Sequence, residues 1–370
     1  MIFVHMKLKE IADFLENVAP LSLQEDYDNS GLLIGNKENE VKRALITLDV
    51  NEDVLDEAIE KKCDLIISHH PILFNGLKKI TGQNHVARIV QKAIENRLSI
   101  YSIHTNLDNV FQNGVNQSMG EILALKKMTV LDPKSNRLNK LIFYSPEDEV
   151  ENILKALHKA GAGNIGSYSH CSFRTGGKGV FMPNDLATPS IGTKNKMSSL
   201  DEMKVEVLIE DFQINAIVDL LKNVHPYEEV AYEVIPLRNE NQEIGSGIIG
   251  ELAEKMDEIS FLSFLKERLN LQSIKYTPYK KEIKKVAIVG GSGSSWLAIA
   301  KKRGADAFIT SDVKYHQFFD AEGEILFADI GHYESEIHTI DLLSNIIQTQ
   351  FPKFAVLLSK TNTNPIKYFI

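Results

Sequence analysis

The sequence predicts an α/β fold in which two duplicated βαβ halves form one core, with a ferredoxin-like βαββαβ domain inserted between them. Three observations support this. Strand-like apolar runs alternate with amphipathic helical runs at both ends of the 370-residue chain. The two ends align with each other, and the middle follows a different order. We expect residues 1–135 and 241–370 to form the core and residues 136–240 the inserted domain.

The first half is predicted to contain three parallel strands. The runs ALITLDV (44–50), CDLIISHH (63–70) and LSIYSIHTNLD (98–108) are apolar and rich in β-branched residues. Between them lie two helical patterns, VLDEAIEKK (54–62) and VARIVQKAIENR (86–97). Strands separated by helices are typical of βαβ units, which build parallel sheets.

The last third repeats this scheme. Strands are predicted at KKVAIVGG (284–291), ADAFITSD (305–312) and EILFADIGH (324–332). A helix is predicted at WLAIAKKRG (296–304), and the final helix at SEIHTIDLLSNIIQ (335–348).

The alignment of the two ends indicates an internal duplication with a pseudo-two-fold axis. Polar residues coincide in three pairs: Asp64 with Asp306, His104 with His332, and Asp108 with Glu336. The alternative is that any two βαβ units look alike. The pairs lie at strand ends, where the apolar pattern of a βαβ unit does not require particular polar residues. Their coincidence therefore favours duplication.

The middle segment has the order strand, helix, strand, strand, helix, strand. The elements are predicted at 138–145, 149–161, 165–183, 204–212, 214–224 and 228–237, where 165–183 is either a strand pair or one long bent strand. Polar, turn-rich linkers flank it, and residues 183–201 are predicted to form a loop. The conspicuous stretch HPYEEVAYE (225–233) is explained more simply by a helix end and an edge strand than by a binding site.

The composition limits the classes of function. With 41 basic and 50 acidic residues the formal charge is −9, which argues against nucleic-acid binding through a general positive field. No apolar run is long enough to span a membrane, so we expect a cytoplasmic protein. The two cysteines, Cys63 and Cys171, are far apart, so a metal site would use nitrogen and oxygen ligands.

Polar side chains gather where four predicted strands end. These clusters are 68–71, 104–108, 312–316 and 332–336. Because pockets in open α/β sheets lie at the carboxyl ends of the strands, the clusters should converge. Converging histidines and carboxylates indicate a metal site.

Two metal ions fit this pattern better than one. His69 and His70 are adjacent at a strand end, so their side chains point to opposite sides. His332 and Glu336 have the i,i+4 spacing that places both on one helix face. Glu336 could then bridge two ions, and Asp108 could complete one of them. Paired ions with open positions activate water against ester, amide or phosphoryl centres.

Other polar residues allow more than one interpretation. A single buried histidine is more often a core residue than a ligand, so His104 and His316 are only candidates for moving protons. Asp49, Asp312 and Ser292 are candidates for supporting the ligands or lining the substrate site.

The stretch VGGSGSSW (289–296) is a Gly-rich turn between a strand and a helix. Its N–H groups could hold a phosphate or another anion. Trp296 stands where a third glycine would be, and the Walker lysine is absent. A tight turn without a ligand is therefore the alternative.

The motifs SHHPILF, IHTNLD, GADAFITSD and GHYESE resemble those of the NGG-one-interacting-factor-three-like family, often called GTP cyclohydrolase 1 type 2 homologues. The resemblance covers residues 7–127 and 241–370. The middle resembles an insertion related to the PII and CutA proteins that some bacterial members carry.

The resemblance implies a dinuclear site. In it His69 and His70 bind one metal each, Asp108 and His332 are further ligands, and Glu336 bridges. Zinc is favoured as the metal, and iron and manganese also suit these ligands. Two departures from the family pattern, at Glu334-Ser335 and at Ser311, leave the ligands intact and bear on substrate contacts. The family also implies a homohexameric ring whose metal sites face an interior cavity.

Two classes of function follow. The first is a dinuclear metal-dependent hydrolase acting on a small molecule or nucleotide, with GTP ring opening suggested by the family name. The second is a metal-binding or regulatory assembly that stores, delivers or senses a metal or nucleotide, or docks onto partners, without turnover. A role in transcription rests on the family name alone, and the acidic charge does not support direct DNA binding.

Overall fold

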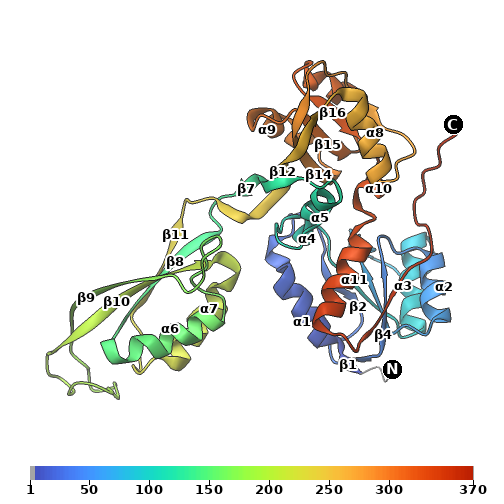
Figure 1. The fold of residues 1–370 in the computed structure, drawn as a ribbon. Coiled ribbons are helices and arrows are strands. Elements are labelled where there is room, and N and C mark those ends of the chain that lie inside the picture. The colour runs from blue at the N-terminus through green and yellow to red at the C-terminus, as the bar shows by residue number, and fades with distance from the viewer. Residues whose placement is uncertain (1–4, 370) are drawn as a thin grey trace. The chain divides into compact units, whose positions relative to one another are not determined.

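The computed structural model describes residues 5–369, and the chain divides into two compact units (Figure 1). The first unit combines both ends of the chain, Met1–Asp132 and Glu243–Ile370. The second unit is Pro133–Gln242.

A five-stranded sheet forms one half of the first unit. Its strands in order are β17 (Ala355–Leu358), β4 (Arg43–Thr47), β5 (Leu65–Ser68), β6 (Ser99–Ser102) and β2 (Gly31–Ile34). The first four are parallel, and β2 is antiparallel to β6. A two-stranded ladder of β1 (Met6–Lys7) and β3 (Glu40–Val41) lies outside this sheet.

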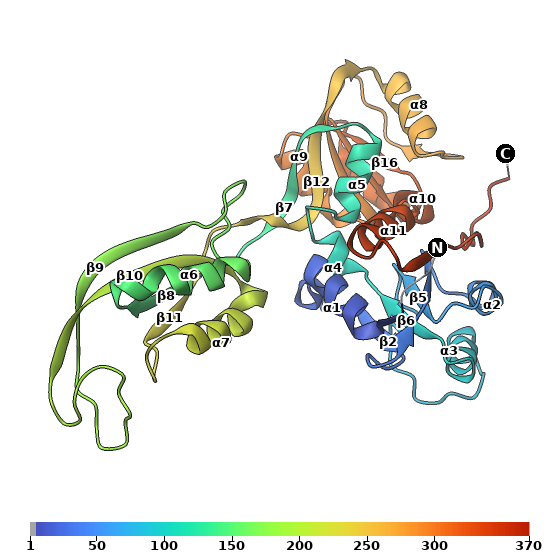
Figure 2. The ribbon, with the colours of Figure 1, turned by 60° about the horizontal axis from the view of Figure 1, so that its bottom comes forward.

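Helices cover both faces of this sheet, as Figure 2 shows. On one face α1 (Leu8–Val18) and α11 (Thr339–Gln350) bury their apolar residues, and on the other α2 (Glu52–Glu60) and α3 (His85–Glu95) do so. Asn51 and Asn84 cap α2 and α3 by accepting a backbone N–H through their side chains.

A six-stranded sheet forms the other half. Its strands in order are β13 (Lys275–Tyr276), β16 (Leu326–Asp329), β15 (Ala307–Ser311), β14 (Ile283–Ser292), β12 (Asn241–Met256) and β7 (Lys126–Lys134). The central three, β16, β15 and β14, are parallel. One face packs against α5 (Val115–Ile122) and α8 (Glu258–Arg268), and the other against α9 (Leu297–Lys302).

The two halves repeat one hydrogen-bond arrangement. The Asp64 carboxylate accepts the backbone N–H groups of Lys42 and Arg43 at 2.7 and 3.2 Å. Asp306 accepts the N–H groups of Lys284 and Lys285, near the start of β14, at 3.0 and 2.8 Å. The predicted α/β fold class with duplicated βαβ halves is confirmed.

A short helix follows the third parallel strand of each half. These helices are α4 (Thr105–Asp108) and α10 (His332–Glu336). The predicted single final helix at 335–348 is wrong, because α10 ends at Glu336 and α11 begins at Thr339. Between them the half-buried side chain of His338 donates from Nε2 to the carbonyl of Val115.

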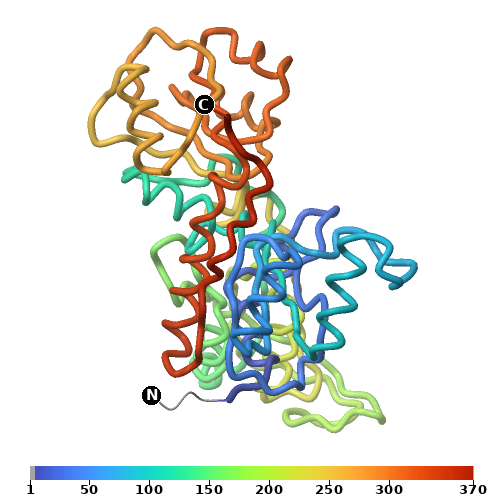
Figure 3. Tube along the Cα trace, turned by 90° about the vertical axis from the view of Figure 1, so that its right-hand side faces the viewer, coloured from blue at the N-terminus to red at the C-terminus, as the bar shows by residue number. Residues whose placement is uncertain are grey.

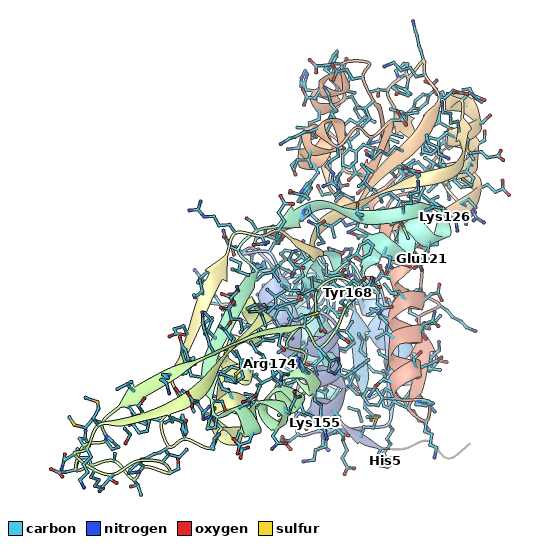
Figure 4. All side chains as sticks on the ribbon, turned by 60° about the vertical axis from the view of Figure 1, so that its left-hand side comes forward. His5, Glu121, Lys126, Lys155, Tyr168 and Arg174 are labelled. Carbon is cyan, nitrogen blue, oxygen red and sulfur yellow. The ribbon has the colours of Figure 1, made fainter. Side chains whose placement is uncertain are left out.

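The second unit is a four-stranded antiparallel sheet with two helices. In chain order its elements are β8 (Leu138–Ser145), α6 (Val150–Lys159), β9 (Ser172–Phe181), β10 (Ser198–Glu210), α7 (Ile214–Val224) and β11 (Tyr232–Leu237). The strand order is β11-β8-β10-β9, and both helices share one core with the sheet. Figure 4 labels Lys155 on α6 and Arg174 on β9, and Arg174 also forms an ion pair with Glu151 of α6 at 2.6 Å.

The residues before β9 form a turn, so 165–183 contains one strand and not a pair. The loop expected at 183–201 ends earlier, because β10 starts at Ser198. Residues 225–233 lead from the end of α7 into the edge strand β11, and His225 donates to the Tyr144 carbonyl at 3.0 Å.

No helix within residues 5–369 is long and apolar enough to cross a membrane. After β17 the last described residues, 359–369, contain neither helix nor strand and form the darkest red part of the trace in Figure 3.

Candidate metal centre

The ends of both sheets bring the predicted ligands together within the first unit. His69 and His70 follow β5, Asp108 ends α4, and His332 and Glu336 lie at the two ends of α10. Three groups of side chains lie close enough to hold a metal ion, namely His69 with Asp108 and Glu336, His70 with His332 and Glu336, and His69 with His70 and His104. Glu336 is common to the first two groups.

The two carboxylate oxygens of Glu336 face different partners. Oε2 lies 2.9 Å from Nε2 of His70 and 3.0 Å from Nε2 of His332. Oε1 lies 4.0 Å from Nε2 of His69. Ligand atoms that share a tetrahedral zinc lie about 3.3 Å apart, so both sides of Glu336 have the spacing that a cation needs.

Two buried polar atoms beside Glu336 lack a partner. Nε2 of His69 and Oδ1 of Asp108 are 3.6 Å apart, and neither has a hydrogen bond among the described residues. Buried polar atoms without partners are rare and need an explanation. A cation between them would satisfy both atoms, so the residues fit a metal ion.

Each of the four histidines in and beside the cluster is oriented by a hydrogen bond at Nδ1. The acceptors are the Ile103 carbonyl for His69 at 2.8 Å, Asp49 for His70 at 2.7 Å, Asp28 for His104 at 2.8 Å, and Asp312 for His332 at 2.7 Å. A carbonyl oxygen cannot donate and an ionised carboxylate only accepts, so Nδ1 carries the proton in each ring. In the neutral ring this leaves the Nε2 lone pair for a metal, the usual arrangement of ligating histidines.

Protons occupy one side of the cluster when no metal is bound. Burial alone would lower the pKa of His70, but its bonds to Asp49 and Glu336 outweigh burial and raise this pKa to about 10. The bonds of His332 to Glu336 and Asp312 likewise overcome burial and raise its pKa to about 9. These bonds hold the pKa of Glu336 well below its usual range despite its burial. Positive charge is therefore favoured at this position.

On the side of the cluster formed by His69 and Asp108, the pKa values shift in the opposite directions. Burial lowers the pKa of His69 to about 3, so this ring is neutral and ready to bind a cation. Burial, together with the charge of Glu336, raises the pKa of Asp108 well above its usual range. A cation would offset the raised pKa of Asp108, because a nearby positive charge favours the ionised carboxylate, and it would keep His69 neutral.

Asp28 is a residue that the sequence analysis missed. Its carboxylate is fully buried and accepts hydrogen bonds from Nδ1 of His104, from Ser30, and from the backbone and hydroxyl of Thr105. Burial opposes ionisation, yet these bonds lower the pKa of Asp28 far below its usual value. Asp28 lies in a loop before β2 and not at the end of a strand, so no spacing in the sequence marked it.

Gly291 brings the Gly-rich turn close to Glu336. It has a φ of +61°, and a Cβ atom there would collide with Oε1 of Glu336. Its N–H donates to Oγ of Ser335 at 2.9 Å, and its carbonyl accepts from Oγ of Ser311 at 2.6 Å. Both departures from the family pattern therefore meet at this turn.

Not every predicted site residue joins the cluster. Asp49 and Asp312 orient ligands, and Ser292 lines a pocket of about 490 Å³ beside the cluster. His316 is exposed on the turn after β15, contacts the rings of Tyr315 and Phe319, and is not among the described residues that line this pocket.

Comparison with known proteins covers nearly the whole chain. Residues 6–365 match the family described as Duf34/NIF3 (NGG1p interacting factor 3). Relatives from Halalkalibacterium halodurans and Bacillus subtilis, each named GTP cyclohydrolase 1 type 2 homolog, are 36% identical over 364 and 366 residues. Each alignment covers 97% of this chain and 98% of the relative.

The fold is also that of solved structures. A Bacillus cereus protein related to NIF3 has a TM-score of 0.86 at 33% identity, covering 97% of this chain and 98% of that one. The reduced HcgD protein of Methanocaldococcus jannaschii has a TM-score of 0.58 at 18% identity over 97% of this chain and 100% of that one, which shows the fold alone.

Proposed function

Because this chain belongs to the Duf34/NIF3 family, we propose that it binds two divalent metal ions and uses them to hydrolyse a small substrate. Its bacterial relatives are named GTP cyclohydrolase 1 type 2 homologs. The observation that carries the proposal is the position of Glu336, whose two oxygens face separate ligand groups.

The ligand sets follow from this geometry. His69, Asp108 and Oε1 of Glu336 would hold one ion, and His70, His332 and Oε2 of Glu336 the other. Imidazole and carboxylate ligands suit zinc, iron and manganese. Such ions, when bound, activate water and polarise the substrate.

The chain itself supplies a group for moving protons. The ring of His104 packs 5.2 Å from that of His69 and 5.3 Å from that of His70, and it lines the pocket. Asp28 holds its Nδ1 proton, so Nε2 is left as a base beside the cluster. His104 is therefore our candidate for accepting a proton from water and returning it to the leaving group.

A measurement of turnover distinguishes a metal-dependent hydrolase from a metal-binding assembly without catalytic activity. His104→Gln should retain the metals and lose hydrolysis of any substrate found by screening phosphoesters, nucleotides and cyclic amides. If neither the unaltered protein nor the His104→Gln variant turns over any of these compounds while both retain metal, a storage or sensing role is favoured. His316→Gln, at an exposed position outside the pocket, is the matched control.

The homohexameric ring remains a prediction of the family resemblance, and the cytoplasmic location remains a prediction from the sequence. Light scattering on the purified full-length chain tests the first. A dilution-independent monomer would contradict it.

A further inference from the structure

The side chains that line the pocket beside the cluster carry more negative charge than is usual for a nucleotide site. Its lining includes the four carboxylates Glu25, Asp49, Asp108 and Glu336, and none of the described lining residues is lysine or arginine. Sites for phosphate chains normally use these cations or free backbone N–H groups. Two divalent ions would carry about four positive charges, which the four carboxylates already balance.

The glycine N–H groups of the Gly-rich turn do not replace the missing cations. Three N–H groups of the Gly-rich turn already have acceptors inside the protein. Gly290 donates to Oδ1 of Asn116 at 2.8 Å, Gly291 to Ser335 at 2.9 Å, and Gly293 to Thr310 at 2.9 Å. The turn is therefore held by side chains, and these groups are not available to a phosphate.

The walls of the pocket are aromatic instead. Tyr27, Phe74, Trp296 and Tyr333 all line it. The Phe74 side chain is 46% exposed, although exposing so large an apolar ring to water is unfavourable. Its ring lies 5.7 Å from that of His104 in an edge-to-face contact, so it stands directly beside the cluster. Nε1 of Trp296 donates to Asp132 at 3.1 Å, which fixes the indole.

We propose that this pocket takes a neutral, flat ring compound that carries a carbonyl or amide group, and that it disfavours ligands with a phosphate chain. This inference rests on the proposed function, because the metal ions would act on that group. An uncharged ring covers the exposed aromatic surface and leaves the charge balance unchanged. A phosphate chain would add negative charge beside four carboxylates, with no lysine or arginine among the described lining residues to offset it.

The test compares ligands that differ only in one phosphate. Binding of guanosine, adenosine and uridine, each against its 5′-monophosphate, is measured by calorimetry on the metal-loaded full-length protein. At least one nucleoside should bind as tightly as its monophosphate or more tightly. Phe74→Ala should weaken that nucleoside about fivefold or more, because base stacking is lost. Phe319→Ala, at an exposed ring outside the pocket lining, should have no effect.

Three results would overturn the inference. They are binding of every monophosphate about tenfold more tightly than its nucleoside, binding that Phe74→Ala leaves unchanged, and no binding of any nucleoside. Metal content is measured in the same samples. A protein that lacks metal but still binds nucleosides through Phe74 would refute the proposed function and leave this inference intact.

Discussion

Nε2 of His70 lies 2.9 Å from Oε2 of Glu336, although 266 positions separate these residues in the chain. His70 belongs to the first βαβ half and Glu336 to the second, so the cluster forms only where the halves meet. The first half alone supplies His69, His70 and Asp108, and the second supplies His332 and Glu336. Each of the two proposed ion sites needs residues from both halves.

Gly291→Ala should lower the metal content of the protein well below that of the control variant Gly304→Ala. A Cβ at this position would displace Glu336. The left-handed φ of +61° adds strain of about 1–2 kcal/mol. Gly304→Ala is the matched control, since its φ is +72° and nothing lies within 4 Å of the added Cβ. Metal content and urea denaturation are measured for both. Equal metal content in the two variants would contradict the close approach of Gly291 to Glu336.

Asp28→Ala should destabilise the protein far more than Asp312→Ala. Each aspartate orients one histidine, but Asp28 is fully buried, whereas the Asp312 side chain is 49% exposed. Removing Asp28 leaves buried donors without an acceptor, at about 1–3 kcal/mol each, whereas an exposed pair contributes about 1 kcal/mol or less. Urea denaturation of the metal-free proteins checks the difference. Similar losses would mean that Asp28 is more accessible to water than the structure indicates.

Metal binding should release protons. In the metal-free protein the pKa values of His70 and His332 are about 10 and 9, so both rings are charged between pH 6 and 8. Ligating imidazole is neutral, and each proton displaced strengthens binding by about tenfold per pH unit. Calorimetry in buffers of different ionisation enthalpy should show release of up to two protons per chain. No release at pH 7 would contradict the charged state of the cluster.

The same pKa shifts have a consequence for the metal-free protein. A histidine whose pKa is raised by folding contributes stability that is fully present below its unfolded value, about 6.5, and is lost as the pH rises through the folded value. The metal-free protein should therefore lose stability between pH 7 and 10, and thermal unfolding across that range measures the loss.

Removal of residues 136–240 with a short linker should leave a folded, metal-binding core. The second unit has its own buried core, and β7 and β12, which lead into and out of it, are neighbours in one sheet. Size-exclusion chromatography and metal analysis check the product. Aggregation of this variant, with the full-length chain soluble under the same conditions, would count against an independent core.

The sequence predicted the parts of the fold that depend on local pattern. Alternating strand and helix signals located the parallel strands, and Asp64 and Asp306, which coincide in the alignment of the two ends, make matching hydrogen bonds in the structure. The boundary between α10 and α11 was missed, because His338 between them makes a tertiary hydrogen bond to Val115 that no periodicity reports.

The candidate site was predictable only where residues follow strands. His69 and His70 follow β5 of one sheet, Glu336 ends the short helix after β16 of the other, and they come together at the carboxyl ends of these strands. Asp28 reaches His104 from a loop, and the C-terminal Thr363 reaches Asp49 with a hydrogen bond of 2.6 Å. These contacts depend on how loops fold over the sheet, which a single sequence does not encode in a simple spacing.

Elemental analysis of the purified full-length protein, prepared without chelator or affinity-tag histidines, measures whether the cluster holds two metal ions. We expect about two divalent ions per chain. We also expect a sharp loss of metal in His69→Ala and Glu336→Ala variants that remain folded by circular dichroism. Near-zero metal in the unaltered protein, even after zinc, manganese or iron is added, would mean that the histidine cluster is structural.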